Sequence, residues 1–201
     1  MCGTLALMQP GPNHRKTMKR REIEGDVRFI TFSCEKRLPL LGNPKVKAII
    51  TESIFVSRAR FGFELFAWVI MPEHVHVLVR PRPPFLLDRA LLAIKLGVSR
   101  KVIKRWKELN APILERLQRP DGTVRFWQKG GGFDRNVRTE AAFCREVRYI
   151  HRNPVQRGLV AKPEDWSWSS VHWWMNKTSE ERGCDPPPGT HAAWDRWRGF
   201  L

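Results

Sequence analysis

Strands are predicted where apolar side chains alternate with polar ones or form short unbroken runs. Residues 27–34 (VRFITFSC) are rich in β-branched and aromatic side chains, and residues 74–80 (HVHVLVR) alternate strictly, so both segments predict strands. Residues 63–70 (FELFAWVI) form a nearly continuous apolar run, which is typical of a buried central strand. A fourth, shorter strand is predicted at 124–128 (VRFWQ), after a Pro-Asp-Gly turn signal.

Helices are predicted where apolar residues recur every three or four positions. The first runs from 44 to about 60, after an Asn cap followed by proline, and the second runs from 85 to about 109. The third begins after Thr139, a good N-cap residue, and is expected to end at about Asn153 because Pro154 follows.

The resulting order is β-α-β-β-α-β followed by one more helix, which predicts an α+β fold. It is the connectivity of a ferredoxin-like sandwich, in which an antiparallel sheet carries helices on one face. We expect this domain to span residues 25–175. Residues 1–24 are interpreted as a flexible N-terminal extension and residues 176–201 as a loosely held C-terminal tail with three consecutive prolines.

The net charge of the chain indicates which class of molecule it binds. The chain of 201 residues carries 36 Lys and Arg against 20 Asp and Glu, a net charge of +16. A balance this basic is typical of proteins that bind nucleic acid, and a basic protein with a solvated charged surface is the alternative. The excess lies inside the folded region, since eleven basic and three acidic residues occur between Arg80 and Arg119. This position favours a nucleic-acid partner.

Two further features bear on location and cofactors. No run of 18 apolar residues exists to cross a membrane, and the N-terminal segment is a poor signal peptide, so we expect a cytoplasmic, nucleoid-associated protein. The four cysteines are scattered and none forms a CxxC or CxxH pair. The sequence therefore argues against a structural zinc site and against disulfides.

The first candidate for chemistry is the pair His74 and His76. Side chains alternate on a strand, so both imidazoles lie on one face while Val75, Val77 and Val79 lie on the other. This spacing suits chelation of one metal ion. Taken alone, the pattern also fits two surface histidines on an amphipathic strand.

The second candidate is Tyr149, the single tyrosine of the chain. Arg145 lies four residues before it and Asn153 four residues after it, so all three share one helical face. The alternative is an ordinary amphipathic helix with a tyrosine packed in the core.

The third candidate is a set of cations dense enough to neutralise several phosphates, with binding that weakens steeply with salt. We expect the DNA contacts to come from Arg80, Arg82, Arg100, Lys101, Lys104, Arg105, Arg125, Arg145, Arg148 and Arg152, with Arg135 and Arg138 nearby in the sequence.

Together these segments are much more specific than each is alone. WVIMPEHVHVLVRP, FWQ, VRYIHRNPVQRGLV and PEDWSWSS occur in this order between residues 27 and 174. In this they resemble the REP-associated tyrosine transposases, a branch of the HUH single-tyrosine transposases. The His-hydrophobic-His and Tyr-Ile-x-x-Asn-Pro motifs are the hallmarks of that group.

The resemblance implies a metal-dependent enzyme that nicks and rejoins single-stranded DNA beside a hairpin, such as a REP-like palindrome. His74, His76 and Asn153 would bind Mg²⁺ or Mn²⁺, and Tyr149 on the last helix would form a 5′-phosphotyrosine and release a 3′-OH. Arg145 and Arg148 would help the phenol to ionise. Relatives work alone or in pairs, so the resemblance leaves both a monomer and a homodimer open.

The chain departs from the family pattern at two internal places. Glu73 stands where many members have Asn, a change we expect to be tolerated because neither residue would touch the metal. Residues 130–133 (GGGF) replace what is commonly an Arg with aromatic residues, so the sequence does not support the DNA contact that the family pattern implies there.

Two other functions fit part of the pattern. A non-catalytic hairpin-binding protein or domesticated repressor would need the charge but not Tyr149. A metal oxygenase would use the histidine pair, although the sequence places no further histidine or carboxylate to complete its metal site.

Overall fold

Four strands form one antiparallel sheet in the order β2-β3-β1-β4. The computed structural model describes residues 25–83, 87–130, 132–176 and 183–188. Its strands are β1 Val27–Ser33, β2 Glu64–Ile70, β3 His74–Arg80 and β4 Phe133–Val137. Its longer helices are α1 Pro44–Phe61, α2 Leu87–Glu108 and α4 Glu140–Gln156, and its shorter ones are α3 Ile113–Leu117, α5 Val171–Asn176 and the 3₁₀ turns Glu35–Arg37 and Pro163–Asp165.

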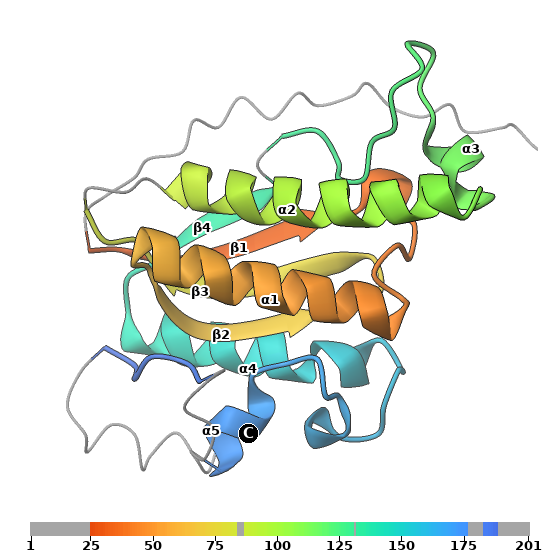
Figure 1. Cartoon of the computed structure of the whole chain (residues 1–201). Helices are drawn as coiled ribbons and strands as arrows, with labels where there is room; N and C mark the ends of the chain where they lie inside the picture. The colour runs from red at the N-terminus through yellow and green to blue at the C-terminus, as the bar shows by residue number, and fades with distance from the viewer. Residues whose placement is uncertain (1–24, 84–86, 131, 177–182, 189–201) are drawn as a thin grey trace, which may run out of the picture.

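Helices α1 and α2 cover one face of the sheet (Figure 1). Asn43 caps α1 through its side-chain oxygen, which accepts from the Lys45 amide at 2.8 Å, and Gly62 ends the helix at a φ of 64°. The side chains of Val75, Val77 and Val79 pack with the apolar stripes of these helices in one buried core. This face is closed by apolar packing.

Helix α4 lies on the opposite face, mainly against β2 and β3 (Figure 1). Phe143, Val147 and Ile150 pack there in a second core with side chains of both strands. A β-bulge between Leu65 and Ala67 places both Phe66 and Ala67 on this side of β2. Because α4 lies along β2 and β3, it does not cover all of β1 and β4 on this face, and a cavity forms beside the helix.

The predicted fold is confirmed, with α4 as the extra helix, but the fourth strand was placed wrongly. It is formed by residues 133–137, whereas residues 124–128 form only isolated bridges, including one from Trp127 to Cys34. The apolar pattern at 124–128 arises because Phe126 and Trp127 are buried in the α1 and α2 core. The true strand has a polar sequence because it is an edge strand with a largely exposed face.

The end of α4 also differs from the prediction. The helix continues through Pro154 to Gln156, and the Arg157 amide still donates to the Asn153 carbonyl at 3.1 Å. Pro154 removes one helical hydrogen bond, but its ring is buried and the last turn is completed beyond it. The extra turn carries Gln156 and Arg157 toward the cavity described below.

The tail is not loose throughout. Residues 183–188 lie along the outer edge of β2, where the Leu65 amide donates to the Asp185 carboxylate at 2.7 Å and the Asp185 amide donates to the Leu65 carbonyl at 2.8 Å. Arg58 of α1 forms an ion pair with Asp185 at 2.7 Å. These contacts satisfy an otherwise open sheet edge. The predicted extension at 1–24 lies outside the described residues, as does most of 176–201.

Among the helices in the described ranges, none combines the length and apolar character needed to span a bilayer.

Candidate active site

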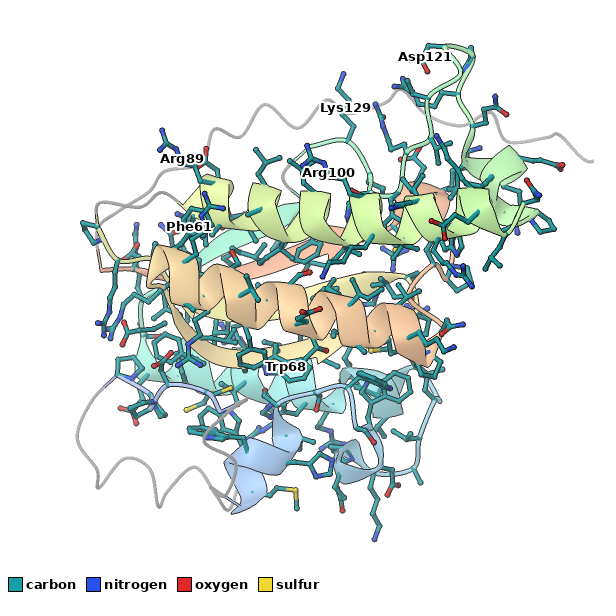
Figure 2. All side chains as sticks on the ribbon, in the orientation of Figure 1. Phe61, Trp68, Arg89, Arg100, Asp121 and Lys129 are labelled. Atoms are coloured by element: carbon teal, nitrogen blue, oxygen red, sulfur yellow. The ribbon has the colours of Figure 1, made fainter. Side chains whose placement is uncertain are left out.

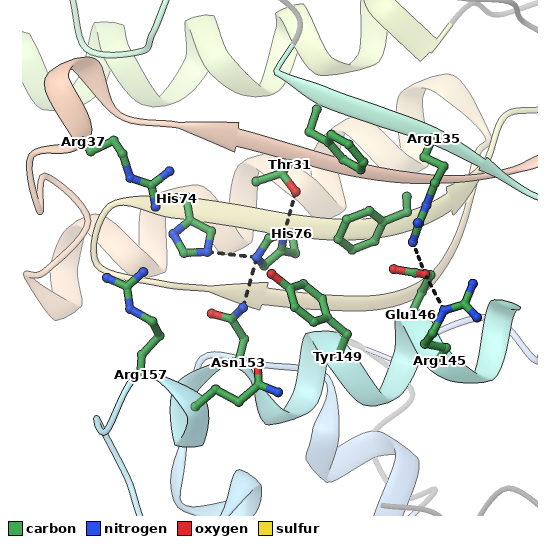
Figure 3. Close-up of a pocket in the computed structure, with 13 residues that line it drawn as sticks. Thr31, Arg37, His74, His76, Arg135, Arg145, Glu146, Tyr149, Asn153 and Arg157 are labelled. Carbon is green, nitrogen blue, oxygen red and sulfur yellow. Dashed lines mark hydrogen bonds and ion pairs between the residues drawn. The ribbon is translucent and has the colours of Figure 1, made fainter. Parts of the chain in front are cut away.

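A cavity of about 620 Å³ opens between α4 and the α4-facing side of β1, β3 and β4 (Figure 3). Its lining brings together His74, His76, Arg145, Tyr149 and Asn153, which come from a strand and a helix more than 60 residues apart in the chain. The predicted metal ligands and the predicted nucleophile therefore share one cavity.

The two histidines face each other inside it. Both lie on the α4 side of β3 and are buried, and their Nε2 atoms are 2.9 Å apart. This confirms the predicted alternation, since Val75 and Val77 point into the opposite core. A surface placement of the pair is excluded.

Glu73 and Thr31 contact the Nδ1 atoms of the two histidines. The Nδ1 of His74 donates to the Glu73 carboxylate at 3.1 Å, and the Nδ1 of His76 lies 2.7 Å from the Thr31 hydroxyl, to which it can donate. With both protons on Nδ1, the two Nε2 lone pairs converge on the same point. Such an arrangement orients imidazoles for a shared cation.

The histidines are kept neutral by their surroundings. Burial lowers the pKa of His76 to about 3, and the neighbouring His74 and the Arg37 cation act in the same direction. Burial also lowers the pKa of His74, against the opposing effect of the Glu73 carboxylate. Neutral imidazole is the form that binds metal ions.

Asn153 of α4 completes the cluster. Its Nδ2 lies 3.3 Å from the Nε2 of His76, and its Oδ1 is buried with no hydrogen-bond partner among the described residues. A 180° rotation of the amide exchanges the two atoms and directs the oxygen toward the histidines. The unpartnered oxygen is the feature that a cation would satisfy.

The donor set fits a hard divalent cation. Adjacent ligands of an octahedral ion with bonds of about 2.1 Å lie about 3 Å apart, close to the 2.9 and 3.3 Å separations around His76. No group of three His, Cys, Asp or Glu side chains capable of holding a metal occurs in the part of the chain that the structure describes. Two imidazoles and one amide are therefore the ligands on offer, and the three-residue site of a metal oxygenase is not formed there.

Tyr149 stands beside this cluster on α4. Its ring lies 5.3 Å from that of His76 and 5.8 Å from that of Phe29, both edge-on, and its hydroxyl points toward the imidazoles (Figure 3). The side chain is 39% exposed, so a substrate can reach it. It is not packed in the core, contrary to the alternative interpretation of this helix.

Arginines line both ends of the cavity, Arg37 and Arg157 at one end and Arg135 and Arg145 at the other (Figure 3). At the first end, Glu73 forms ion pairs with Arg37 at 3.4 Å and with Arg157 at 3.0 Å. At the other end, the buried Glu146 pairs with Arg135 and, at 3.6 Å, with Arg145.

The sequence analysis missed Arg37, Arg157, Thr31 and Glu146. Arg157 continues the four-residue spacing of 145, 149 and 153, so the helical pattern could have found it. Arg37 lies in a 3₁₀ turn between β1 and α1, where no sequence periodicity marks it.

The predicted DNA-binding cations are distributed over several surfaces. Arg145 lines the cavity, whereas Arg148 and Arg152 are exposed on α4 outside its lining. Arg80 and Arg82 both pair with Glu64 near the far end of β3 from His74. Arg125 is half-buried in the loop before β4.

The remaining four, Arg100, Lys101, Lys104 and Arg105, are exposed on α2, which covers the face of the sheet away from the cavity (Figure 1). Figure 2 shows Arg100 on this helix. Lys101 pairs with Glu52 at 3.2 Å, and Arg105 with Glu108 at 3.1 Å. Of the ten cations predicted to contact DNA, Arg145 is the one that lines the cavity, and all ten DNA contacts stay predictions.

Both departures from the family pattern border the site. Glu73 contacts His74, as described, and so has a structural role in place of Asn. Gly132 has a φ of 76°, and a Cβ there would lie 1.9 Å from the Thr31 carbonyl oxygen, so this glycine allows β4 to approach β1. Phe133 follows it and lines the cavity.

Three known proteins are similar to this chain over most of its length. The REP-associated tyrosine transposase of Escherichia coli K12 is 26% identical over 159 residues, covering 77% of this chain and 81% of the relative. A putative REP-associated tyrosine transposase of Haemophilus influenzae is 26% identical over 162 residues, covering 77% and 84%. The solved structure of a REP-associated tyrosine transposase bound to a REP hairpin superposes with a TM-score of 0.64 at 21% identity, covering 89% of this chain and 96% of that one.

A family model described as "Transposase IS200 like" matches residues 27–129, a segment that contains both histidines. The matched segment is more than half of the chain, and the protein belongs to the IS200-like transposase family.

Proposed function

We propose that this protein is a metal-dependent endonuclease and strand transferase that cleaves single-stranded DNA beside a hairpin through a 5′-phosphotyrosine. The observation that carries the proposal is the convergence of Tyr149, His74, His76 and Asn153 in one cavity. The relative whose structure shares this fold was solved with a REP hairpin, which supports hairpin DNA as the substrate class.

The chain's own residues suit phosphoryl transfer. The Tyr149 hydroxyl attacks the scissile phosphorus, a new Oη–P bond forms, and the P–O3′ bond breaks. The phenolic proton passes to solvent, and the leaving O3′ takes up a proton to become a free 3′-OH. The phosphodiester is conserved in the phosphotyrosine, so a 3′-OH from another strand can reverse the step without a nucleotide cofactor.

His74, His76 and Asn153 would hold the divalent ion, Mg²⁺ or Mn²⁺. When bound, it would polarise the scissile phosphate and offset the charge that develops in the transition state. Thr31 and Glu73 keep the imidazoles oriented for this purpose through their Nδ1 contacts.

The test uses labelled single strands taken from the DNA that flanks the gene, chosen for any imperfect palindromes found there. We expect wild-type protein to form a covalent adduct in Mn²⁺ or Mg²⁺, and EDTA to prevent it. Tyr149→Phe is expected to bind the same DNA with unchanged affinity and to form no adduct.

The outcomes separate the two leading functions. Binding by wild-type protein without any adduct on its own flanking DNA would favour a non-catalytic hairpin-binding protein on the same fold. An adduct that persists in Tyr149→Phe would reject Tyr149 as the nucleophile, because the chain has no second tyrosine.

A further inference from the structure

We infer that Arg37 and Arg157 bind a DNA phosphate on the upstream side of the scissile bond, the side that leaves with the 3′-OH. This inference rests on the proposed function and adds the direction in which the strand crosses the cavity. The arginines would act as a positioning pair for the leaving strand.

The first observation is how the pair is held. Both guanidinium groups contact the same Glu73 Oε1 through Nη2, while their side chains remain 54% and 52% exposed. Glu73 is buried and balances one of the two cations, so the group carries a net positive charge at the cavity wall. The guanidinium donors not directed at Glu73 are available to a phosphate, whose geometry suits the planar arginine fork.

The second observation is backbone strain at Arg37. This residue and Lys36 both have a φ of 52°, in the left-handed region that residues other than glycine seldom adopt. The left-handed turn carries Arg37 to the cavity from the connection between β1 and α1. Strained backbone of this kind tends to persist at functional sites.

The third observation is the order of groups along the cavity, which the contacts fix. Glu73 touches the Nδ1 of His74, His74 faces His76, and the ring of His76 contacts the ring of Tyr149. The Arg37 and Arg157 pair therefore lies on the far side of the imidazoles from Tyr149 (Figure 3).

The Arg135 and Arg145 pair lies on the tyrosine side. Arg135 stands 5.9 Å over the Phe29 ring, which itself contacts Tyr149, and both arginines pair with Glu146, one helical turn before the tyrosine. The cavity thus has a tyrosine end and a histidine end, each with its own cations.

Phosphoryl transfer then gives the strand its direction. The attacking and leaving oxygens lie roughly in line across the phosphorus. With the Tyr149 oxygen on one side, O3′ leaves on the opposite side, toward the Glu73 end. The upstream strand continues from O3′, so its next phosphate meets Arg37 and Arg157, and the strand attached to Tyr149 continues toward Arg135 and Arg145.

The experiment neutralises phosphates one at a time on the DNA. Hairpin strands that wild-type protein cleaves are made with a single methylphosphonate at the first phosphate upstream or downstream of the scissile one. Adduct formation and release of the labelled 3′-OH fragment are measured for wild type, Arg37→Ala and Arg157→Ala. Arg119→Ala, which removes an exposed arginine that pairs with Asp121 at 3.5 Å, is the charge-matched control.

For wild type, we expect the upstream methylphosphonate to speed release of the 3′-OH fragment by about tenfold or more, as loss of a charge-assisted hydrogen bond predicts. Arg37→Ala and Arg157→Ala should show that faster release on unmodified DNA and little further change with the upstream methylphosphonate. Their response to the downstream methylphosphonate should match that of wild type and Arg119→Ala. Mn²⁺ affinity, measured by calorimetry, should stay within a few-fold, which separates the effect from damage to His74.

Each other pattern overturns the inference. If Arg37→Ala and Arg157→Ala respond to the upstream methylphosphonate as wild type does, the assigned direction has no support. If these variants lose the response to the downstream methylphosphonate instead, the direction is reversed. In both cases, adduct formation by wild-type protein leaves the proposed function intact. Absence of an adduct with wild-type protein would reject the proposed function, and the assignment of a leaving strand with it.

Discussion

On the face of the sheet covered by α1 and α2, strand β3 presents Val75, Val77 and Val79, all buried in an apolar core. On the face toward α4, the same strand presents His74 and His76, which are equally buried but are held by hydrogen bonds to Glu73 and Thr31. One strand thus supplies packing to one side and polar chemistry to the other.

The difference lies in how completely helices cover each face. Helices α1 and α2 cover the first face so that Val75, Val77 and Val79 are at most 2% exposed, whereas α4 lies mainly over β2 and β3 and leaves part of β1 and β4 beside the cavity. Polar side chains beside the edge of α4 can be shielded from water and still contact a ligand in the cavity. We therefore expect changes on the first face to affect stability, and changes on the second to affect reaction.

Among changes that compare the two faces of β3, the largest effect is expected from His76→Ala, which removes the group at the centre of the cluster. Adduct formation should fall by about 10³-fold, since a bound metal supplies several kcal/mol of charge stabilisation. Mn²⁺ at 100 times its Kd should stabilise wild type by about 2.7 kcal/mol, seen as a rise in Tm. His76→Ala should show no rise in Tm with Mn²⁺, and EDTA should abolish the rise in Tm of wild type. A metal-induced shift of equal size in His76→Ala would contradict the ligand assignment.

The next effect tests the apolar face. Ile54 of α1 is fully buried, and Ile54→Ala should lower the free energy of unfolding by about 2–5 kcal/mol, measured from urea melts. Val56 on the same helix is 61% exposed, and Val56→Ala should change it by less than about 0.5 kcal/mol. Adduct formation per folded molecule should be unchanged in both. A loss of activity in folded Ile54→Ala would show that the two faces are coupled.

The smallest effect is expected on α2. If Arg100 meets a phosphate, as its sequence context predicts, Arg100→Ala should weaken hairpin binding by less than about tenfold and reduce the slope of log K against log salt by about one. Cleavage at saturating DNA should be unaffected because Arg100 lies on the side of the sheet away from the cavity. An unchanged salt slope would show that this helix is only a solvated basic surface.

Local periodicity carried most of the fold prediction. The alternation in 74–80 assigned the two histidines and the three valines to opposite faces, and the structure confirms it. The same reasoning failed at 124–128, where apolar residues fill a core from a loop, and at the edge strand 133–137, whose polar sequence has no periodic signal. A repeating apolar pattern indicates which side chains are buried. It identifies a helix or strand only where the buried residues lie in one, and Phe126 and Trp127 are buried from a loop.

The sequence by itself determined the two halves of the candidate site. Strand alternation paired His74 with His76, and the four-residue helical spacing placed Arg145, Tyr149 and Asn153 on one face. Both periods are properties of the backbone and need no tertiary information.

Only the tertiary structure decided how the halves meet and what surrounds them. The packing of α4 on β2 and β3 brings Asn153 within 3.3 Å of His76, and the turns before α1 and after α4 deliver Arg37 and Arg157 to one carboxylate. Such contacts depend on which surfaces pack together and on individual turn geometries, and no repeating pattern along the chain encodes them.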